Sequence, residues 1–162
     1  MRRRLPMVTA IALSVVVVGL AIASGWLGVV SLRNKDEADQ KAKATQSARQ
    51  MGVNLMSLNS DTAQRDLDRI VNGTTGDFKN KLAGQSKAFM DQVTKAKAKS
   101  TVTDVDAALV SIDGDSAEVM VSLTGTVTND KVQNGTPQGY RYQMDLTRVD
   151  GRWLVSGLEV VP

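Results

Sequence analysis

The side chains that most often perform catalysis are missing from this chain. Its 162 residues include no His and no Cys, which removes the commonest general base, the commonest metal ligand and any thiolate nucleophile. Acid–base chemistry would therefore depend on carboxylates, with a Tyr hydroxyl as hydrogen-bond donor. Four acidic residues stand in segments of alternating polarity: Asp104, Asp106, Glu118 and Asp145. They fall out of phase with the apolar positions, so we expect them to face solvent.

Tyr140 and Tyr142 alternate in phase with the apolar positions and are expected to point inward. Without an inward carboxylate beside them, they are interpreted as aromatic residues of the core or its rim. We therefore expect no catalytic residue, no cofactor and no metal site. Asp113-Gly114-Asp115 lacks the further ligands of a Ca²⁺ loop and indicates a hairpin turn. Asn72-Gly73-Thr74 and Asn134-Gly135-Thr136 fit the glycosylation pattern but are interpreted as turns.

Large apolar side chains offer a second kind of site, a cavity that could hold an acyl chain. The candidates for its lining are Phe78, Phe89, Met90, Tyr142, Met144 and Trp153. The alternative is an ordinary packed core, because a domain with so few aromatic residues needs most of them for packing. The sequence alone leaves both interpretations open.

An uncharged N-terminal segment precedes all of these residues. Arg2, Arg3 and Arg4 are followed by 28 uncharged positions, 5–32, mostly Val, Ala, Leu, Ile and Gly. As a helix they would span roughly 42 Å, against about 30 Å for the hydrocarbon core of a bilayer. Basic residues after the segment are diluted by acidic ones, so the Lys/Arg bias places residues 1–4 in the cytoplasm. We predict a single-pass protein of the cell (inner) membrane with an exported C-terminal domain.

A cleaved secretory signal is the competing interpretation. Ala21-Ile22-Ala23 fits a cleavage site, but the apolar run continues to Val30, and Trp26 suits an interfacial anchor. The absence of Cys excludes a lipoprotein anchor. Small residues recur near one face of the segment, at Ala10, Ser14, Ala21, Gly25 and Gly28. They indicate either a contact with another membrane helix or the usual abundance of Gly and Ala in such segments.

The charge distribution argues against nucleic-acid binding. The pI is about 9.3, yet the chain beyond residue 32 has 17 basic and 17 acidic residues. Residues 33–100 carry 13 bases and 8 acids, whereas residues 101–162 carry 4 bases and 9 acids. The overall basic footprint of a polynucleotide-binding domain is therefore missing. We expect two solvated surfaces of opposite charge bias instead.

Hydrophobic periodicity predicts three helices after the membrane segment. Residues 33–57 are expected to form a helical stalk whose thin, Ala-rich stripe meets the core near Met51. The stalk is interpreted as a solvated connection, with a partner-binding coiled coil as the alternative. Helices are also expected near 62–71 and 78–97. The basic cluster Lys95–Lys99 suits the negative end of the last helix, or a contact with an acidic partner or a lipid headgroup.

From Ser100 the period changes to two, which predicts a four-stranded antiparallel meander. A polar loop is expected from Asn129 to Gln138, and Asp150-Gly151 indicates a tight hairpin before the last strand. The domain is therefore α+β, with residues 58–162 as its exported body.

In this order of elements the chain resembles the Mce-associated membrane proteins of actinobacteria, small partners of the mammalian-cell-entry (Mce) lipid import systems. The residues that carry the resemblance are the N-terminal anchor, Leu67-Asp68-Arg69-Ile70, Thr75-Gly76-Asp77-Phe78, the Ala/Lys-rich third helix and the ending from Leu146 to Val155. The resemblance implies the fold of the nuclear transport factor 2-like superfamily, in which helices pack against a curved sheet and leave a cone-shaped cavity. It also implies a non-catalytic accessory role beside Mce proteins or permease subunits of a lipid transporter.

Two further functions stay open. The domain could itself be a lipid-binding module that holds cargo in its cavity. The periplasmic scaffold domains of type IV secretion machines are similar in architecture, which makes a scaffold role the other alternative.

Overall fold

The computed structural model describes residues 36–162. Residues 36–56 are helical. The elements after them are η1 (Ser60–Thr62), α2 (Ala63–Asn72), α3 (Gly76–Lys95), β1 (Lys99–Asp113), β2 (Ser116–Asn129), β3 (Val132–Val149) and β4 (Arg152–Val161). The chain divides into two units, residues 1–40 and residues 41–162. No helix among the described residues is long and apolar enough to cross a bilayer, and the predicted membrane segment 5–32 lies outside them.

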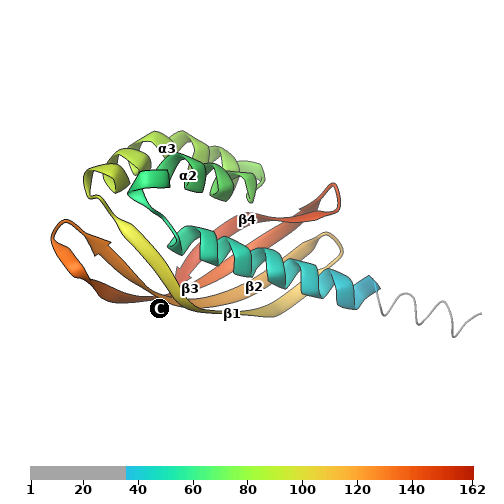
Figure 1. Ribbon diagram of the computed structural model, residues 1–162. Coiled ribbons are helices and arrows are strands. Elements are labelled where there is room, and N and C mark those ends of the chain that lie inside the picture. The colour runs from blue at the N-terminus through green and yellow to red at the C-terminus, as the bar shows by residue number, and fades with distance from the viewer. Residues whose placement is uncertain (1–35) are drawn as a thin grey trace, which may run out of the picture. The chain divides into compact units, whose positions relative to one another are not determined.

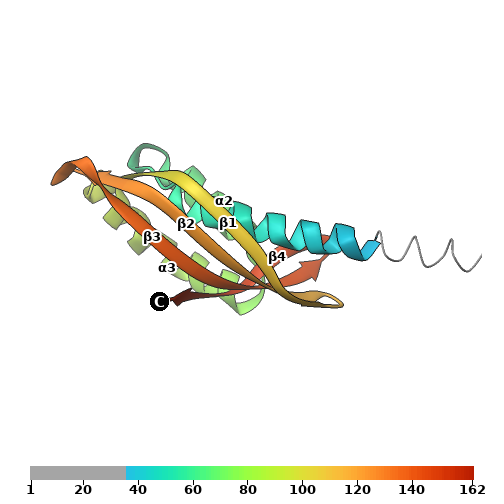
Figure 2. The same ribbon diagram turned by 90° about the horizontal axis from the view of Figure 1, so that it is seen from below.

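Within residues 41–162 the strands form one antiparallel sheet in the order β1-β2-β3-β4. The helices lie against one face of this curved sheet (Figure 1). The view from below has the strands in front of the helices, so the other face of the sheet carries no layer from this unit (Figure 2). The prediction of an α+β domain with three helices and a four-stranded antiparallel meander is confirmed.

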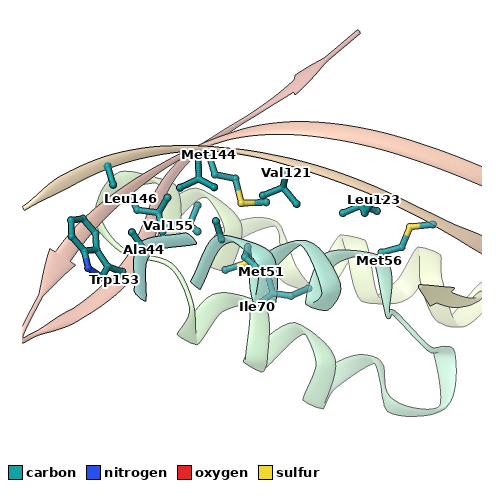
Figure 3. Close-up of a cluster of buried hydrophobic side chains, with 13 residues drawn as sticks. Ala44, Met51, Met56, Ile70, Val121, Leu123, Met144, Leu146, Trp153 and Val155 are labelled. Atoms are coloured by element: carbon teal, nitrogen blue, oxygen red, sulfur yellow. The ribbon is translucent and has the colours of Figure 1, made fainter. Parts of the chain in front are cut away.

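The core lies between the sheet and the part of the first helix that belongs to this unit, residues 41–56. Successive inward positions of β2 are buried because side chains alternate along a strand, and β3 and β4 add residues at the matching register. The buried apolar residues from the sheet are Ala117, Val119, Val121, Leu123, Met144, Leu146, Trp153 and Val155. Figure 3 places Met51, Met56 and Ile70 opposite them. Each large side chain buried here stabilises the fold by roughly 1.5–3 kcal/mol.

The helix that was predicted to be a solvated stalk joins the core earlier than expected. Ala44 and Ala48 are fully buried, about two turns and one turn before Met51 respectively. Small side chains let the helix axis approach the sheet closely, and Gly52 is one point of close approach. A Cβ at Gly52 would lie 2.9 Å from Val121 Cγ1. The stripe consists of small residues, which allow the sheet to lie directly against this face of the helix.

The segment predicted as a polar loop, Asn129 to Gln138, is instead mostly strand. β2 continues to Asn129, β3 starts at Val132, and only two residues turn between them. Backbone hydrogen bonds form a ladder whatever the side chains are, so a run of Gly, Asn and Thr can extend a hairpin. Asn129 Oδ1 accepts hydrogen bonds at 2.9 Å from the amides of Lys131 and Val132, which holds the turn.

Two lysines of the predicted basic cluster form ion pairs rather than simply facing the helix end. Lys97 Nζ lies 3.4 Å from Asp130 Oδ2 at the tip of the β2–β3 hairpin, and Lys99 Nζ lies 2.8 Å from Asp61 Oδ2 in η1. The backbone between them also takes part, since the amide of Ser60 donates to the carbonyl of Ala98. The cluster therefore links the end of α3 to two other segments.

Lys99→Met is expected to raise the pKa of Asp61 back toward its ordinary value of 3.8. The hydrogen bond from Lys99, followed by its charge, holds that pKa below 3.8. A carboxyl with a lowered pKa in the folded state adds stability above its unfolded pKa, and this stability is lost as pH falls through the lowered value. NMR titration of the Asp61 side chain measures the change. Lys97→Met, which removes the neighbouring pair instead, should leave the pKa of Asp61 unchanged, and equal shifts in both variants would contradict the assignment.

Candidate functional site

An apolar cavity of about 370 Å³ lies between the helices and the sheet. The last turn of the helix 36–56 and α2 form one wall, α3 covers it, and β3 with the end of β2 closes the other side. Its lining residues are Leu55, Met56, Leu58, Leu67, Ile70, Leu82, Gln85, Ser86, Phe89, Ser100, Val127, Tyr140 and Tyr142. The volume falls within the range of roughly 300–1,000 Å³ that is usual for small-molecule sites.

The cavity lies beneath α3, which packs against the core only through partly buried side chains such as Phe78 and Leu82. None of its 20 residues is buried, although Leu82 and Phe89 face the cavity. Phe89 keeps 39% of its surface exposed. The helix is held at its ends, where Thr75 N donates to the carbonyl of Val155 and Asp130 N donates to the carbonyl of Ala96. Held at both ends and with no buried residue of its own, α3 covers the apolar space without filling it.

The polar groups at the cavity are neutral. Its lining contains no Asp, Glu, Lys or Arg, and the polar side chains are Gln85, Ser86, Ser100 and the two Tyr hydroxyls. The rings of Tyr140 and Tyr142 stack with centroids 5.9 Å apart. Burial raises the pKa of Tyr142, and the neighbouring Tyr140 adds to the effect, so this hydroxyl stays protonated at neutral pH. The arrangement favours an uncharged, apolar ligand with one or two hydrogen-bond acceptors.

The six residues predicted to line a cavity are distributed over three places. Phe89 and Tyr142 line the apolar cavity. Met144 and Trp153 are buried in the core, and Phe78 packs against that core half-buried. Met90 borders a different surface hollow, beside η1 and the start of α2. The predicted membrane-helix contacts at Ala10, Ser14, Ala21, Gly25 and Gly28 lie outside the described residues.

Several lining residues were not singled out by the sequence. Leu55 and Leu67 stood in the helical apolar pattern, but nothing local distinguished a cavity wall from a core contact. Leu58 lay between the predicted helices 33–57 and 62–71, and Val127 lay just before the loop predicted from Asn129. They line the same cavity because α3 lies over them. Hydrophobic periodicity does not predict where one helix lies relative to another.

A buried carboxylate does occur, but it has a structural role. Asp66 is 5% exposed. Its Oδ2 accepts from Thr62 Oγ1 at 2.6 Å and from the amide of Asn59 at 3.3 Å, and its Oδ1 lies 3.0 Å from Arg69 Nη2. These partners satisfy the carboxylate at the start of α2 and leave it outside the apolar cavity.

The strand carboxylates take the positions expected of them. Asp104, Asp106 and Asp145 are exposed, and Glu118 accepts a hydrogen bond from Gln143 Nε2 at 2.6 Å. The turn at Gly114 joins β1 to β2, and Arg148 Nε donates to Asp115 there at 2.7 Å. Over residues 36–162 no group of three or more His, Cys, Asp or Glu side chains is placed to hold a metal ion.

Solved structures of bacterial secretion and conjugation proteins have this fold. An IcmL-like type IV secretion system protein from Legionella pneumophila superposes with a TM-score of 0.58 at 13% identity, covering 75% of this chain and 92% of that one. CagV, a VirB8 homolog from Helicobacter pylori, gives 0.56 at 9% identity, covering 74% and 97%. An Ntf2-like protein involved in plasmid conjugation gives 0.53 at 14% identity, covering 75% and 48%. At such identities the likeness establishes the fold alone.

Sequence comparison identifies the family. The chain is 28% identical over 165 residues to the uncharacterized protein Rv1363c of Mycobacterium tuberculosis, covering 100% of this chain and 63% of that protein. A second protein of that organism, Rv1362c, is 28% identical over 137 residues, covering 83% of this chain and 62% of its own length. The chain thus spans about three fifths of the length of these relatives. A family model described as uncharacterized protein Rv1363c/MT1408-like matches residues 5–162, and the chain therefore belongs to the Rv1363c/MT1408-like family.

Proposed function

We propose that this protein is a non-catalytic, membrane-anchored accessory or scaffold subunit of a multiprotein complex in the cell envelope, with residues 58–162 in its extracytoplasmic domain. The observation that carries the proposal is the fold of residues 41–162. It is similar to that of a type IV secretion system protein and of a VirB8 homolog of such a system. The uncharged segment 5–32 supports the anchor, since its length suits a bilayer.

The chemistry of the apolar cavity supports a non-catalytic role. General acid–base catalysis needs a titratable group within hydrogen-bond reach of the substrate. The apolar cavity has only the Tyr140 and Tyr142 hydroxyls, and the pKa of Tyr142 is raised further. The buried carboxylate of Asp66 is engaged by Thr62 and Arg69. These features favour binding or assembly over turnover.

Within that role, we favour an Mce-type lipid import complex as the assembly. The resemblance to Mce-associated membrane proteins supports it, because it extends over the anchor, the motif Leu67-Asp68-Arg69-Ile70 and the Trp153 ending. The scaffold of a type IV secretion-like machine is the alternative, supported by the structural similarities. The partners expected are Mce proteins or permease subunits in the first case and secretion components in the second.

Affinity purification of the tagged full chain from its own membranes tests the proposal. Mass spectrometry of the eluate should recover Mce or permease components above the level found with an untagged strain. Recovery of secretion components instead would favour the scaffold alternative. An eluate with no envelope protein enriched would contradict both.

Replacing Gly25 and Gly28 together with Leu is expected to weaken recovery of the partners while leaving insertion in the membrane intact. Small residues allow close packing of membrane helices, and Leu is as well tolerated by lipid as Gly. Carbonate extraction of the membranes checks the insertion. Unchanged recovery would mean that the segment 5–32 serves only as an anchor.

The apolar cavity supports a second candidate function, a lipid-binding module. Its volume of about 370 Å³ and its neutral lining suit part of a hydrocarbon chain. Organic extraction of the purified full chain, followed by mass spectrometry, should then release a lipid in a fixed ratio to protein. Ser86→Leu narrows the cavity and should lower that ratio, whereas Ala88→Leu on the exposed side of α3 should not. Equal lipid content in both variants would mean that the lipid comes from the detergent micelle around the protein and not from the cavity.

A further inference from the structure

A second hollow, of about 780 Å³, is lined by Met51 and Asn54 among others and shares no lining residue with the apolar cavity. Three segments far apart in the sequence form it. Residues 42–54 of the first helix make one wall, the C-terminal end of α2 the second, and the start of β4 the third. We call it the cationic groove.

The groove is named for its charges. Lys43, Arg69 and Arg152 line it, and no Asp or Glu does. Arg69 is partly neutralised by Asp66, whose carboxylate is buried behind it at 3.0 Å. Neither Lys43 nor Arg152 forms an ion pair with another residue in the range 36–162. The hollow is therefore lined by two cations without an ion-pair partner among residues 36–162, Lys43 and Arg152, and by Arg69, which is paired with Asp66.

Arg152 owes its position to the turn before it. Asp150 and Gly151 both adopt positive φ, at 50° and 76°, as a two-residue hairpin turn requires. The turn starts β4 at Arg152, which places this side chain beside the first helix. Ser47 Oγ donates to the carbonyl of Trp153 at 2.6 Å and fastens the helix to this strand.

A buried amide supplies a further donor. Asn54 is 6% exposed, and its Oδ1 accepts a hydrogen bond from Gln50 Nε2 at 3.1 Å. Its Nδ2 donates to none of the residues from 36 to 162. Because no fully enclosed polar side-chain atom in that range lacks a partner, this N–H group is open to the groove. An accessible N–H group in this position can donate a hydrogen bond to water or to a ligand in the groove.

We propose that the cationic groove binds the phosphate of an organic phosphate ester. Arg guanidinium forks and amide N–H groups match the acceptor oxygens of phosphate, and Lys43 adds a point charge at the rim. Apolar surface from Met51, Trp153 and Leu154 lies in the same hollow, which gives the organic part of the ester a contact that bare phosphate would not use.

Two sources of such a phosphate share this chemistry, a lipid headgroup and a soluble ester. The groove begins at Ala42, ten residues after Leu32 in the sequence, and ten residues of chain span at most about 36 Å. If the segment 5–32 is the anchor proposed above, the chain length brings the groove within reach of headgroups. The binding of phosphate itself does not depend on that anchor.

The full chain with Trp26→Phe, held in nonionic detergent, tests the proposal through the fluorescence of Trp153. Glycerol 3-phosphate should change the emission saturably, and glycerol should not. Lys43→Gln with Arg152→Gln should weaken the apparent affinity by about tenfold or more, since each charge-assisted hydrogen bond contributes roughly 1.5–3 kcal/mol. Lys79→Gln with Lys81→Gln removes the same net charge from exposed sites on α3 and should leave the affinity within about twofold.

Mixed micelles separate the two sources. Saturation by phosphatidylglycerol, with glycerol 3-phosphate competing, supports a lipid headgroup, whereas a response to glycerol 3-phosphate alone supports a soluble ester. No response to either phosphate overturns the proposal, as does an equal loss of affinity in the two double variants. A response confined to an acidic peptide such as oligo-glutamate also overturns it and identifies the groove as a protein contact. Each of these results leaves the co-purification test unaffected.

Discussion

Leu123→Ala is expected to lower the free energy of unfolding by about 2–5 kcal/mol. Leu123 is 1% exposed and lies on the inward face of β2, where it packs beside Gly52 of the first helix. Removing its three terminal carbons loses transfer free energy and leaves a cavity between two elements that are already close. The total stability of a domain is only about 5–15 kcal/mol, so the variant should be severely weakened.

Urea unfolding of the full chain, followed by circular dichroism, measures this loss. Val160→Ala is a matched control on the same sheet, because Val160 is 66% exposed and surface substitutions usually change stability by less than about 0.5 kcal/mol. A change below 1 kcal/mol in Leu123→Ala would mean that the helix and β2 do not pack as described.

Gly52→Val is expected to cost about 1–3 kcal/mol or more, because it overfills a close contact between the first helix and β2. A Cβ alone would lie 2.9 Å from Val121 Cγ1 and 3.1 Å from Leu123 Cδ2. The helix would have to move away from the sheet and loosen its neighbours. Helix propensity predicts the opposite sign, since Gly is less favourable than other residues in a helix interior.

Gly84→Ala separates propensity from packing. Gly84 lies within α3, where an added Cβ meets nothing within 4 Å, so this change should stabilise the protein by roughly 0.5–1 kcal/mol. A double-mutant cycle gives the sharper measurement. Gly52→Ala should cost less in a Val121→Ala background, with a coupling of about 0.5–3 kcal/mol. Additive effects would rule out direct contact between positions 52 and 121.

The packing of the first helix illustrates why the predicted boundaries and the observed ones differ. The apolar stripe predicted for it consisted of Ala38, Ala42, Thr45, Ala48, Gly52, Leu55 and Met56 and did not include Ala44. An Ala-rich stripe of this kind is equally typical of a solvated helix. Only the packing of this helix against the sheet decides that Ala44 is fully buried. In the same way, the polar composition of residues 129–138 led to the prediction of a loop where the structure has mostly strand. Strand pairing uses backbone groups that every residue carries.

The candidate sites also differ in how far the sequence could predict them. Phe89 and Tyr142 were predicted to line a cavity because they are large and on apolar faces, and Met144 and Trp153 were indistinguishable from them by type and spacing. The structure separates them by burial. Met144 on β3 lies in the centre of the core, whereas Tyr142 on the same strand lines the cavity beneath α3. The cationic groove was not predicted, because Lys43, Arg69 and Arg152 are ordinary surface residues in each local pattern.

The sequence by itself determined the types and order of the elements, the outward direction of the strand carboxylates and the absence of His and Cys chemistry. These depend on composition and on periods of two and 3.6 residues, which are local properties. Only the tertiary structure decided where the first helix meets the sheet, why α3 leaves an apolar cavity and which three cations share a groove. Those features depend on distances between segments that are tens of residues apart, and no local pattern specifies such distances.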